Sequence, residues 1–177
     1  MKVGIIVGRF QVPDLTKGHQ GLFSKAFNEC EKLIVFIGET KNGKITPHDP
    51  LPYEPRANMI VEFFLNRYGK GKIPQIYKIV DIGDYPKWVE DLDSKIQSLM
   101  NLELIEESDD INIYGSRDSV AEKYKENGGK YKTCVVQEVG TGISGTEVRK
   151  NIWESYKPDW DKEKREFAIW LAGKLED

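Results

Sequence analysis

The chain places one of its two histidines where an apolar run gives way to an amphipathic segment. The stretch "VGRFQVPDLTKGHQGLF", residues 7–23, carries Arg9 just after the apolar run, then a polar loop, then Gly18 and His19. A helix N-terminus with free N–H groups binds anions, and a glycine there lets a phosphate approach the backbone closely. His19 can donate a hydrogen bond to the same anion, and Arg9 adds a permanent charge. The pattern predicts a phosphate site.

Each of these residues also has a simpler explanation. Thr16 is a good helix N-cap, His19 could be an exposed residue of the first turn, and Arg9 could be a solvated loop charge. The stretch also lacks both common phosphate loops, since it contains neither G-x-G-x-x-G nor G-x-x-x-x-G-K-[ST]. The occurrence of the whole set directly after the first apolar run favours the phosphate site.

A second stretch, "GISGTEVRKNI" at residues 142–152, opens the last helical region. Ser144 and Glu147 have the spacing of a capping box, which accounts for these two residues without any function. The capping box does not account for Thr146 and Arg149. A second helix N-terminus with hydroxyl donors and a bidentate cation would bracket a triphosphate together with the first one.

Strand and helix patterns alternate along the chain. Continuous apolar runs predict buried strands, and amphipathic stretches predict the helices between them. The strands are expected at residues 2–8, 32–38, 74–82, 111–116 and 132–138, and the helices at 18–30, about 54–68, 85–100, up to about 126, and 145 to about 174. This alternation predicts an α/β fold, a Rossmann-like doubly wound parallel five-stranded sheet with helices on both faces and a C-terminal helical extension.

The expected sheet explains where the candidate residues lie. The 177 residues are enough for one domain, 1–177, whose C-terminal helical region begins at about residue 145. Ligands of such sheets bind beyond the carboxyl ends of the strands. The first stretch follows the first strand, as that rule requires.

Both stretches resemble known motifs. "TKGH" resembles the (H/T)-x-G-H signature of a nucleotidyltransferase superfamily, and "GRFQ" is similar to the GRFQPxHxGH form of nicotinamide mononucleotide (NMN) adenylyltransferases. "SGTEVR" is similar to the form of the second motif, I-S-x-T-x-x-R, in archaeal NMN adenylyltransferases. The sequence departs from the first motif because Thr16 replaces its first histidine and "VPDL" lengthens the loop.

The resemblance implies roles for individual residues. His19, Arg9 and Arg149 would be catalytic, with Ser144, Thr146 and Arg149 on the β- and γ-phosphates of ATP. The implied nucleotide-binding residues are Gly8, Phe10, Thr16, Gly18, Ser144, Thr146, Gly115 and Arg117; the last two lie in "YGSRDS", where the family binds adenosine.

The acceptor side has two candidates. Arg56 lies in "HDPLPYEPRANMI", which resembles a segment whose arginine contacts the nucleotide substrate; the alternative is a solvated arginine at a helix start. Trp88 falls where the family carries a tryptophan that stacks on the nicotinamide ring. It also forms a helical stripe with Leu92 and Ile96, so a core tryptophan is an equal alternative.

The resemblance predicts transfer of AMP from ATP to NMN, giving NAD and pyrophosphate. The acceptor phosphate has a second pKa of about 6, so it is largely ionised at neutral pH and needs no general base. Mg²⁺ would be carried by the ATP phosphates, and no protein metal site is expected. The alternatives are another adenylyl- or cytidylyltransferase acting on a different phosphate acceptor, and a nucleotide-binding module without turnover.

Composition limits the partners and the compartment. The net charge of −3 gives no global argument for nucleic acid or an anionic membrane, and the apolar runs are too short to span a bilayer. The partners expected are therefore small nucleotides, ATP and NMN, with a homo-oligomer left open. Cys30 and Cys134 are the only cysteines and are predicted to be small core residues without a disulfide, which fits a reducing cytoplasm. The N-terminus lacks the apolar region of a signal peptide.

Overall fold

The computed structural model describes residues 1–46, 48–116, 120–136 and 147–150. Three of the candidate residues, Arg117, Ser144 and Thr146, lie outside this part of the chain. So does most of the predicted C-terminal helical region, of which only the helical residues 147–150 are described.

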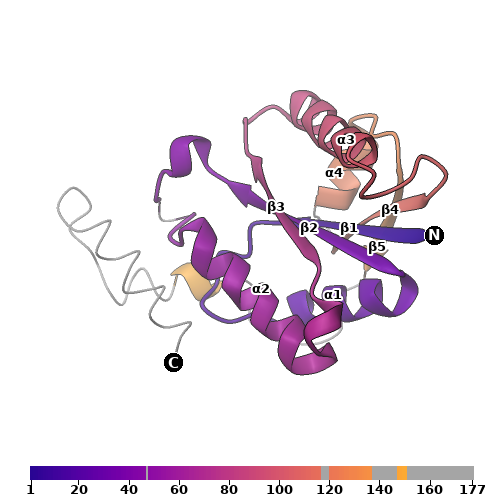
Figure 1. Ribbon diagram of the computed structural model, residues 1–177. Helices are drawn as coiled ribbons and strands as arrows, with labels where there is room; N and C mark the ends of the chain where they lie inside the picture. The colour runs from indigo at the N-terminus through magenta and orange to yellow at the C-terminus, as the bar shows by residue number, and fades with distance from the viewer. Residues whose placement is uncertain (47, 117–119, 137–146, 151–177) are drawn as a thin grey trace.

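One parallel five-stranded sheet forms the centre of the molecule (Figure 1). Its strands stand in the order β3-β2-β1-β4-β5, and all neighbours run parallel. The strands are β1 Lys2–Gly8, β2 Lys32–Glu39, β3 Gln75–Val80, β4 Asp110–Ser116 and β5 Lys132–Val136. The predicted sheet is confirmed. The chain moves outward from β1 to β3 and then returns to β4 on the other side, so the strand order reverses beside β1.

Helices cover both faces of the sheet, with α1 and α2 on one face and α3 and α4 on the other (Figure 1). Their bounds are α1 Lys17–Glu29, α2 Tyr53–Tyr68, α3 Tyr85–Asn101 and α4 Val120–Glu126. Two short 3₁₀ helices, η1 Lys41–Gly43 and η2 Lys70–Lys72, lie in the connections. The doubly wound arrangement expected from the alternation is therefore present.

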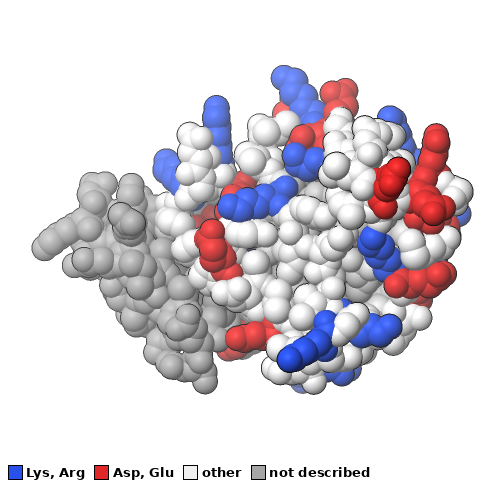
Figure 2. All heavy atoms as spheres, viewed as in Figure 1, with Lys and Arg blue, Asp and Glu red and all other residues white. Residues whose placement is uncertain are grey.

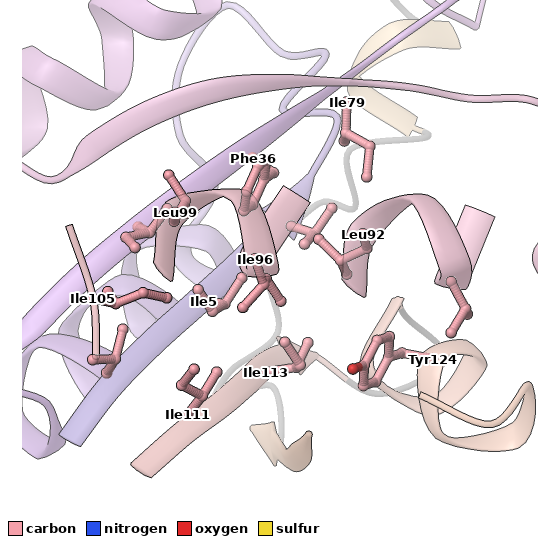
Figure 3. Packing of buried hydrophobic residues seen from close by; sticks show 14 residues of the cluster. Ile5, Phe36, Ile79, Leu92, Ile96, Leu99, Ile105, Ile111, Ile113 and Tyr124 are labelled. Carbon is pink, nitrogen blue, oxygen red and sulfur yellow. The ribbon is translucent and has the colours of Figure 1, made fainter. Parts of the chain in front are cut away.

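Each face of the sheet has its own hydrophobic core. On one face, apolar side chains of α3 pack on those of the strands, and Tyr124 of α4 joins them (Figure 3). On the other face, Phe23 of α1 and Phe64 of α2 pack against β1 and β2. Strands β1, β2 and β4 are buried over most of their length, which explains why they appear in the sequence as continuous apolar runs. The edge strand β3 is more exposed.

Charged side chains of both signs are interspersed over the face shown in Figure 2. Among the described helices, none is long and apolar enough to cross a membrane. Cys30 and Cys134 are free thiols and only partly buried, so the prediction of two core cysteines holds only in part. Cys30 donates a hydrogen bond to the hydroxyl of Tyr114 at 3.4 Å, and burial raises the pKa of its thiol.

Candidate functional site

Helix α1 begins immediately after the loop that leaves β1, and Thr16 is its N-cap. The Thr16 hydroxyl accepts a hydrogen bond from the backbone N–H of His19 at 3.3 Å. In return, the backbone N–H of Thr16 donates to Nδ1 of His19 at 3.3 Å. This is a capping box in which an imidazole replaces the usual Glu or Gln. The simpler explanation of Thr16 is therefore confirmed, but the cap also includes His19.

The cap fixes the tautomer of His19. Because Nδ1 accepts a hydrogen bond, the proton of the neutral ring resides on Nε2, which becomes a donor. His19 is partly buried rather than exposed. Burial lowers the pKa of the imidazole to about 4, and the charge of Arg149 adds to this effect. His19 is thus a neutral hydrogen-bond donor at neutral pH.

Arg9 follows β1 and is held by two carboxylates. Its Nη1 lies 3.0 Å and 2.9 Å from the two carboxylate oxygens of Asp49, and its Nη2 contacts Oδ2 of Asp81. The stem of Arg9 lies over Gly38, where a Cβ would stand only 3.3 Å from Cγ of the arginine. Its side chain is 45% exposed, so Arg9 faces solvent but is not a freely solvated charge.

Both carboxylates are themselves positioned by the backbone or by neighbouring side chains. Asp49 is buried, and its N–H donates to the Thr46 hydroxyl at 3.0 Å. Gln11 holds the following turn. Its Oε1 accepts from the N–H of Leu51 at 2.7 Å, and its Nε2 donates to the carbonyl of Leu51 at 3.1 Å. The Asp49 carboxylate is therefore presented from a fixed loop after β2.

Asp81 comes directly after β3, and its Oδ1 accepts from the N–H of Gly83 at 2.9 Å. Asp49 and Asp81 were not among the site residues predicted from the sequence. The signal for Asp81 is its position directly after β3, at the edge where ligands of parallel sheets bind, whereas Asp49 lies farther along the loop after β2 and has no such signal. The partner of these acids was not visible, since Arg9 lies 40 and 72 residues away from them in the chain.

Arg56 lies in the first turn of α2 and is only 2% exposed, so the alternative of a solvated arginine is wrong. Its guanidinium donates to the carbonyls of Arg9 at 2.8 Å, Gly38 at 2.6 Å and Pro52 at 3.0 Å. Burial lowers the pKa of Arg56 to about 10, although the Glu39 carboxylate acts in the opposite direction. Arg56 therefore ties the carboxyl ends of β1 and β2 to α2. A direct contact with a nucleotide stays a prediction.

A pocket of about 350 Å³ opens beside Arg9 at the carboxyl ends of β1 to β3. Its apolar wall includes Ile79, Trp88 and Val120, and its polar residues include Arg9 and Asp81. Trp88 is partly buried and also packs against the core under α3. The core alternative for this tryptophan is therefore confirmed in part, whereas stacking on a nicotinamide ring stays a prediction.

Four of the predicted nucleotide-binding residues are placed as follows. Gly8 ends β1 and also lines the pocket. Gly18 lies in the first turn of α1, and Gly115 is buried within β4. The ring of Phe10 is only 4% exposed and packs into the core, so a nucleotide contact at Phe10 stays a prediction for its backbone alone.

Arg149, a residue of the second motif, lies close to His19 of the first motif. Its charge lowers the pKa of His19, and its own pKa is lowered by burial and by Arg9, with Asp49 acting in the opposite direction. These effects require proximity, so four groups far apart in the sequence form one electrostatic cluster. The other predicted phosphate ligands of this motif, Ser144 and Thr146, lie outside the described residues.

Within the ranges that the structure describes, no three His, Cys, Asp or Glu side chains gather as metal ligands. The second histidine, His48, is exposed in the loop after β2.

The sequence matches no protein-family model and no curated protein. The structure is similar to a bifunctional NMN adenylyltransferase/ADP ribose pyrophosphatase from Francisella tularensis, with a TM-score of 0.69 and 18% identity over 87% of this chain and 42% of that chain. The likeness shows a shared fold. It is the Rossmann-like α/β fold that the alternation of strands and helices predicted.

Two other solved structures are also similar to this one. A bifunctional protein of the same kind from Francisella tularensis, complexed with AMP and Mn ion, gives a TM-score of 0.66 and 18% identity over 98% of this chain and 51% of that chain. A NadR protein in complex with NR gives 0.50 and 17% identity over 88% of this chain and 39% of that chain. The chain thus spans about half or less of the length of these neighbours.

Proposed function

We propose that the protein transfers AMP from ATP to NMN, giving NAD and pyrophosphate. The observation that carries the proposal is the convergence of Arg9, His19 and Arg149 at the carboxyl end of β1, next to a pocket lined by Trp88. Two cations and a neutral hydrogen-bond donor suit a polyphosphate, and an apolar pocket with an indole suits a flat ring. The names of the structural neighbours, NMN adenylyltransferases among them, support the same chemistry.

In the proposed reaction, an oxygen of the acceptor phosphate attacks the α-phosphorus of ATP in line. A new O–P bond forms, the bond from the α-phosphorus to the bridging oxygen breaks, and pyrophosphate leaves together with the Mg²⁺ that ATP brought. The acceptor phosphate is already ionised, so no proton has to be removed. The protein contributes position and charge stabilisation.

His19 acts on the reacting phosphate. Its Nε2–H is kept as a donor by the bond that Thr16 gives to Nδ1. A donor aimed at an α-phosphate oxygen stabilises the negative charge that grows in the transition state. Because the pKa of His19 is lowered to about 4, the ring does this as a neutral imidazole across the physiological range.

The two arginines act on the β- and γ-phosphates. Arg149 approaches from the second motif, where we propose that Ser144 and Thr146 add hydroxyl donors. Arg9 is held by Asp49 and Asp81 in this structure, so it must exchange at least one carboxylate for a phosphate. Arg56 keeps the Arg9 backbone in place during this exchange.

The first experiment is chromatography of the products formed from ATP, Mg²⁺ and NMN by the full chain. We expect NAD and pyrophosphate in equal amounts. His19→Ala should lower the rate about 100- to 1,000-fold, the usual cost of one donor to a developing anion. Thermal unfolding of the variant must show that it is folded, because His19 also belongs to the α1 cap.

Absence of NAD with the folded wild type would overturn the NMN assignment. The same assay with other phosphate monoesters, and with CTP in place of ATP, then separates another nucleotidyltransferase from a nucleotide-binding module. Turnover with one of these acceptors would keep the reaction type and change the substrate.

A further inference from the structure

Phe10 has an unusual backbone. Its φ is 51°, in the left-handed region that bulky residues avoid. The other non-glycine residues with positive φ in the described part of the chain are Asn42, which tolerates that region, and Glu103. A strained bulky residue persists only where its surroundings hold it, and such residues cluster at functional sites. Phe10 lies between two residues of the candidate site, Arg9 and His19, in the loop that joins β1 to α1.

The strained backbone places the Phe10 ring beneath His19. The ring stacks on Phe23 of α1 with centroids 5.3 Å apart and an interplanar angle of 27°. It meets the imidazole of His19 with centroids 5.3 Å apart and an angle of 65°, an edge-to-face contact. Aromatic rings in this arrangement attract each other and restrict rotation. The phenyl ring is thus anchored on one side by the core and touches His19 on the other.

The end of β1 leaves room for the same ring. A Cβ at Gly8 would stand 2.8 Å from Cζ of Phe10, closer than such atoms approach. Gly8 therefore has a packing role in addition to the nucleotide contact predicted for it. The strand end, the strained residue and the helix start together form one unit around His19.

We propose that Phe10 is a positioning residue for His19: its ring fixes the plane of the imidazole, while the Thr16 N–H fixes which nitrogen carries the proton. The hydrogen bond from Thr16 restrains one ring atom and leaves rotation about that contact possible. The edge-to-face contact favours one ring plane and so opposes this rotation. The catalytic consequence rests on the proposed function, whereas the effect on the imidazole itself does not.

A pair of variants separates positioning from ordinary core packing. Phe10→Leu keeps a buried apolar side chain but loses the ring against His19. Phe64→Leu is the matched control, since Phe64 is a buried ring of the same core that contacts Phe23 rather than Phe10. Both should lose stability to a similar extent, as substitutions of buried aromatic side chains do.

We expect the two variants to differ at His19. In Phe10→Leu, kcat for NAD formation should fall about 10- to 100-fold, as a misplaced catalytic group does, with a much smaller change in KM for ATP. Phe64→Leu should keep kcat within about twofold of the wild type. Equal losses of kcat in both variants would overturn the proposal.

A second readout does not depend on activity. The chain has two histidines, so imidazole NMR signals are easily assigned with a His48→Asn variant. In Phe10→Leu the pKa of His19 should rise from about 4 toward 6.5, because the imidazole becomes less buried, and in Phe64→Leu it should stay unchanged. Arg149, whose charge also acts on the ring, is present in both. If the wild type forms no NAD, this titration still tests whether the Phe10 ring sets the environment of the imidazole, and an unchanged pKa in Phe10→Leu would count against the proposal.

A third measurement uses only the wild-type protein, in case the Phe10 variant does not fold. Nuclear Overhauser effects between the Phe10 ring protons and the imidazole protons of His19 should be strong, because the ring centroids lie 5.3 Å apart. The His19 ring should show one set of cross-peaks, as a single orientation requires. Cross-peaks from two ring orientations would overturn the proposal.

Discussion

At the scale of single residues, the chemistry of His19 is set by its contacts. An imidazole in water has a pKa near 6.5 and exchanges its proton between two nitrogens. In this protein, burial and the charge of Arg149 keep the ring neutral, and the N–H of Thr16 assigns the proton to Nε2. The same residue in an exposed first turn would be partly cationic at neutral pH and would point in several directions.

A pH dependence of stability follows from this environment. The pKa of His19 is about 6.5 in the unfolded chain and about 4 in the folded protein. Between these values the unfolded state binds a proton that the folded state does not, so the free energy of unfolding rises with pH. His19 therefore costs no stability above about pH 6.5, and up to about 3 kcal/mol is lost as the pH falls to 4.

Urea unfolding of the wild type and of His19→Gln at several pH values measures this effect. The glutamine variant keeps a polar side chain at the cap but has no proton to gain. Its stability should fall less than that of the wild type between pH 6.5 and pH 4. Parallel curves for the two proteins would show that His19 is not buried as described.

At the scale of elements, the site depends on how the carboxyl ends of the strands are joined to the helices that follow. Arg56 joins β1, β2 and α2 through three carbonyl groups, and its Nη2 also lies 3.6 Å from the Glu39 carboxylate. Arg9 joins the ends of β1 and β3 and the loop after β2 in the same way. The backbone hydrogen bonds between strands end where the strands separate. Beyond that point the side chains of these two arginines link the segments instead.

Arg56→Met should be strongly destabilising. The variant leaves partly buried carbonyls without their donor and the Glu39 carboxylate with Lys78 alone, at 3.9 Å, which costs about 3–5 kcal/mol. Arg67→Met in the last turn of the same helix is the control, because Arg67 is exposed and lies over the rings of Phe63 and Tyr68. The control should cost less than about 1 kcal/mol. Chemical denaturation of both variants measures the difference, and similar values would contradict it.

At the scale of the whole molecule, a buried polar network holds the β4–β5 half together. The carboxylate of Asp93 in α3 accepts from the hydroxyl of Tyr124 in α4 and from the N–H of Lys130 at 3.3 Å. The Tyr124 hydroxyl in turn accepts from the N–H of Tyr131 at 3.1 Å. The network connects two helices to the start of β5, and burial raises the pKa of Tyr124.

Tyr124→Phe should destabilise this half of the sheet. It removes one donor to a buried carboxylate and one acceptor from a backbone N–H, so we expect a loss of about 1–3 kcal/mol. Amide hydrogen exchange should quicken most in β5, next to the changed residue. Tyr85→Phe is the control, since Tyr85 is largely exposed, and it should leave exchange in β5 as it is in the wild type. Uniform acceleration across all five strands would contradict a local role.

The sequence by itself determined the strands, the helices and the edge at which the site lies. These follow from local periodicity, because a strand buried on both faces must be continuously apolar and its loop must leave at a carboxyl end. The segment around Arg9 and His19 was found in this way. The N-cap at Thr16 was predicted from the four residues of "TKGH". The motif resemblance added the expectation of a nucleotidyltransferase, and solved structures that include an NMN adenylyltransferase/ADP ribose pyrophosphatase share the fold of this chain.

Only the tertiary structure decided which partners these residues have. Asp49 and Asp81 hold Arg9 across 40 and 72 residues, and the charge of Arg149 reaches His19 from the far end of the described chain. From the sequence, Arg56 could be a solvated arginine, and the resemblance gave Phe10 a nucleotide contact. In the structure both side chains are buried. Burial and pairing depend on which segments the sheet brings together, and no local pattern encodes contacts between residues so far apart.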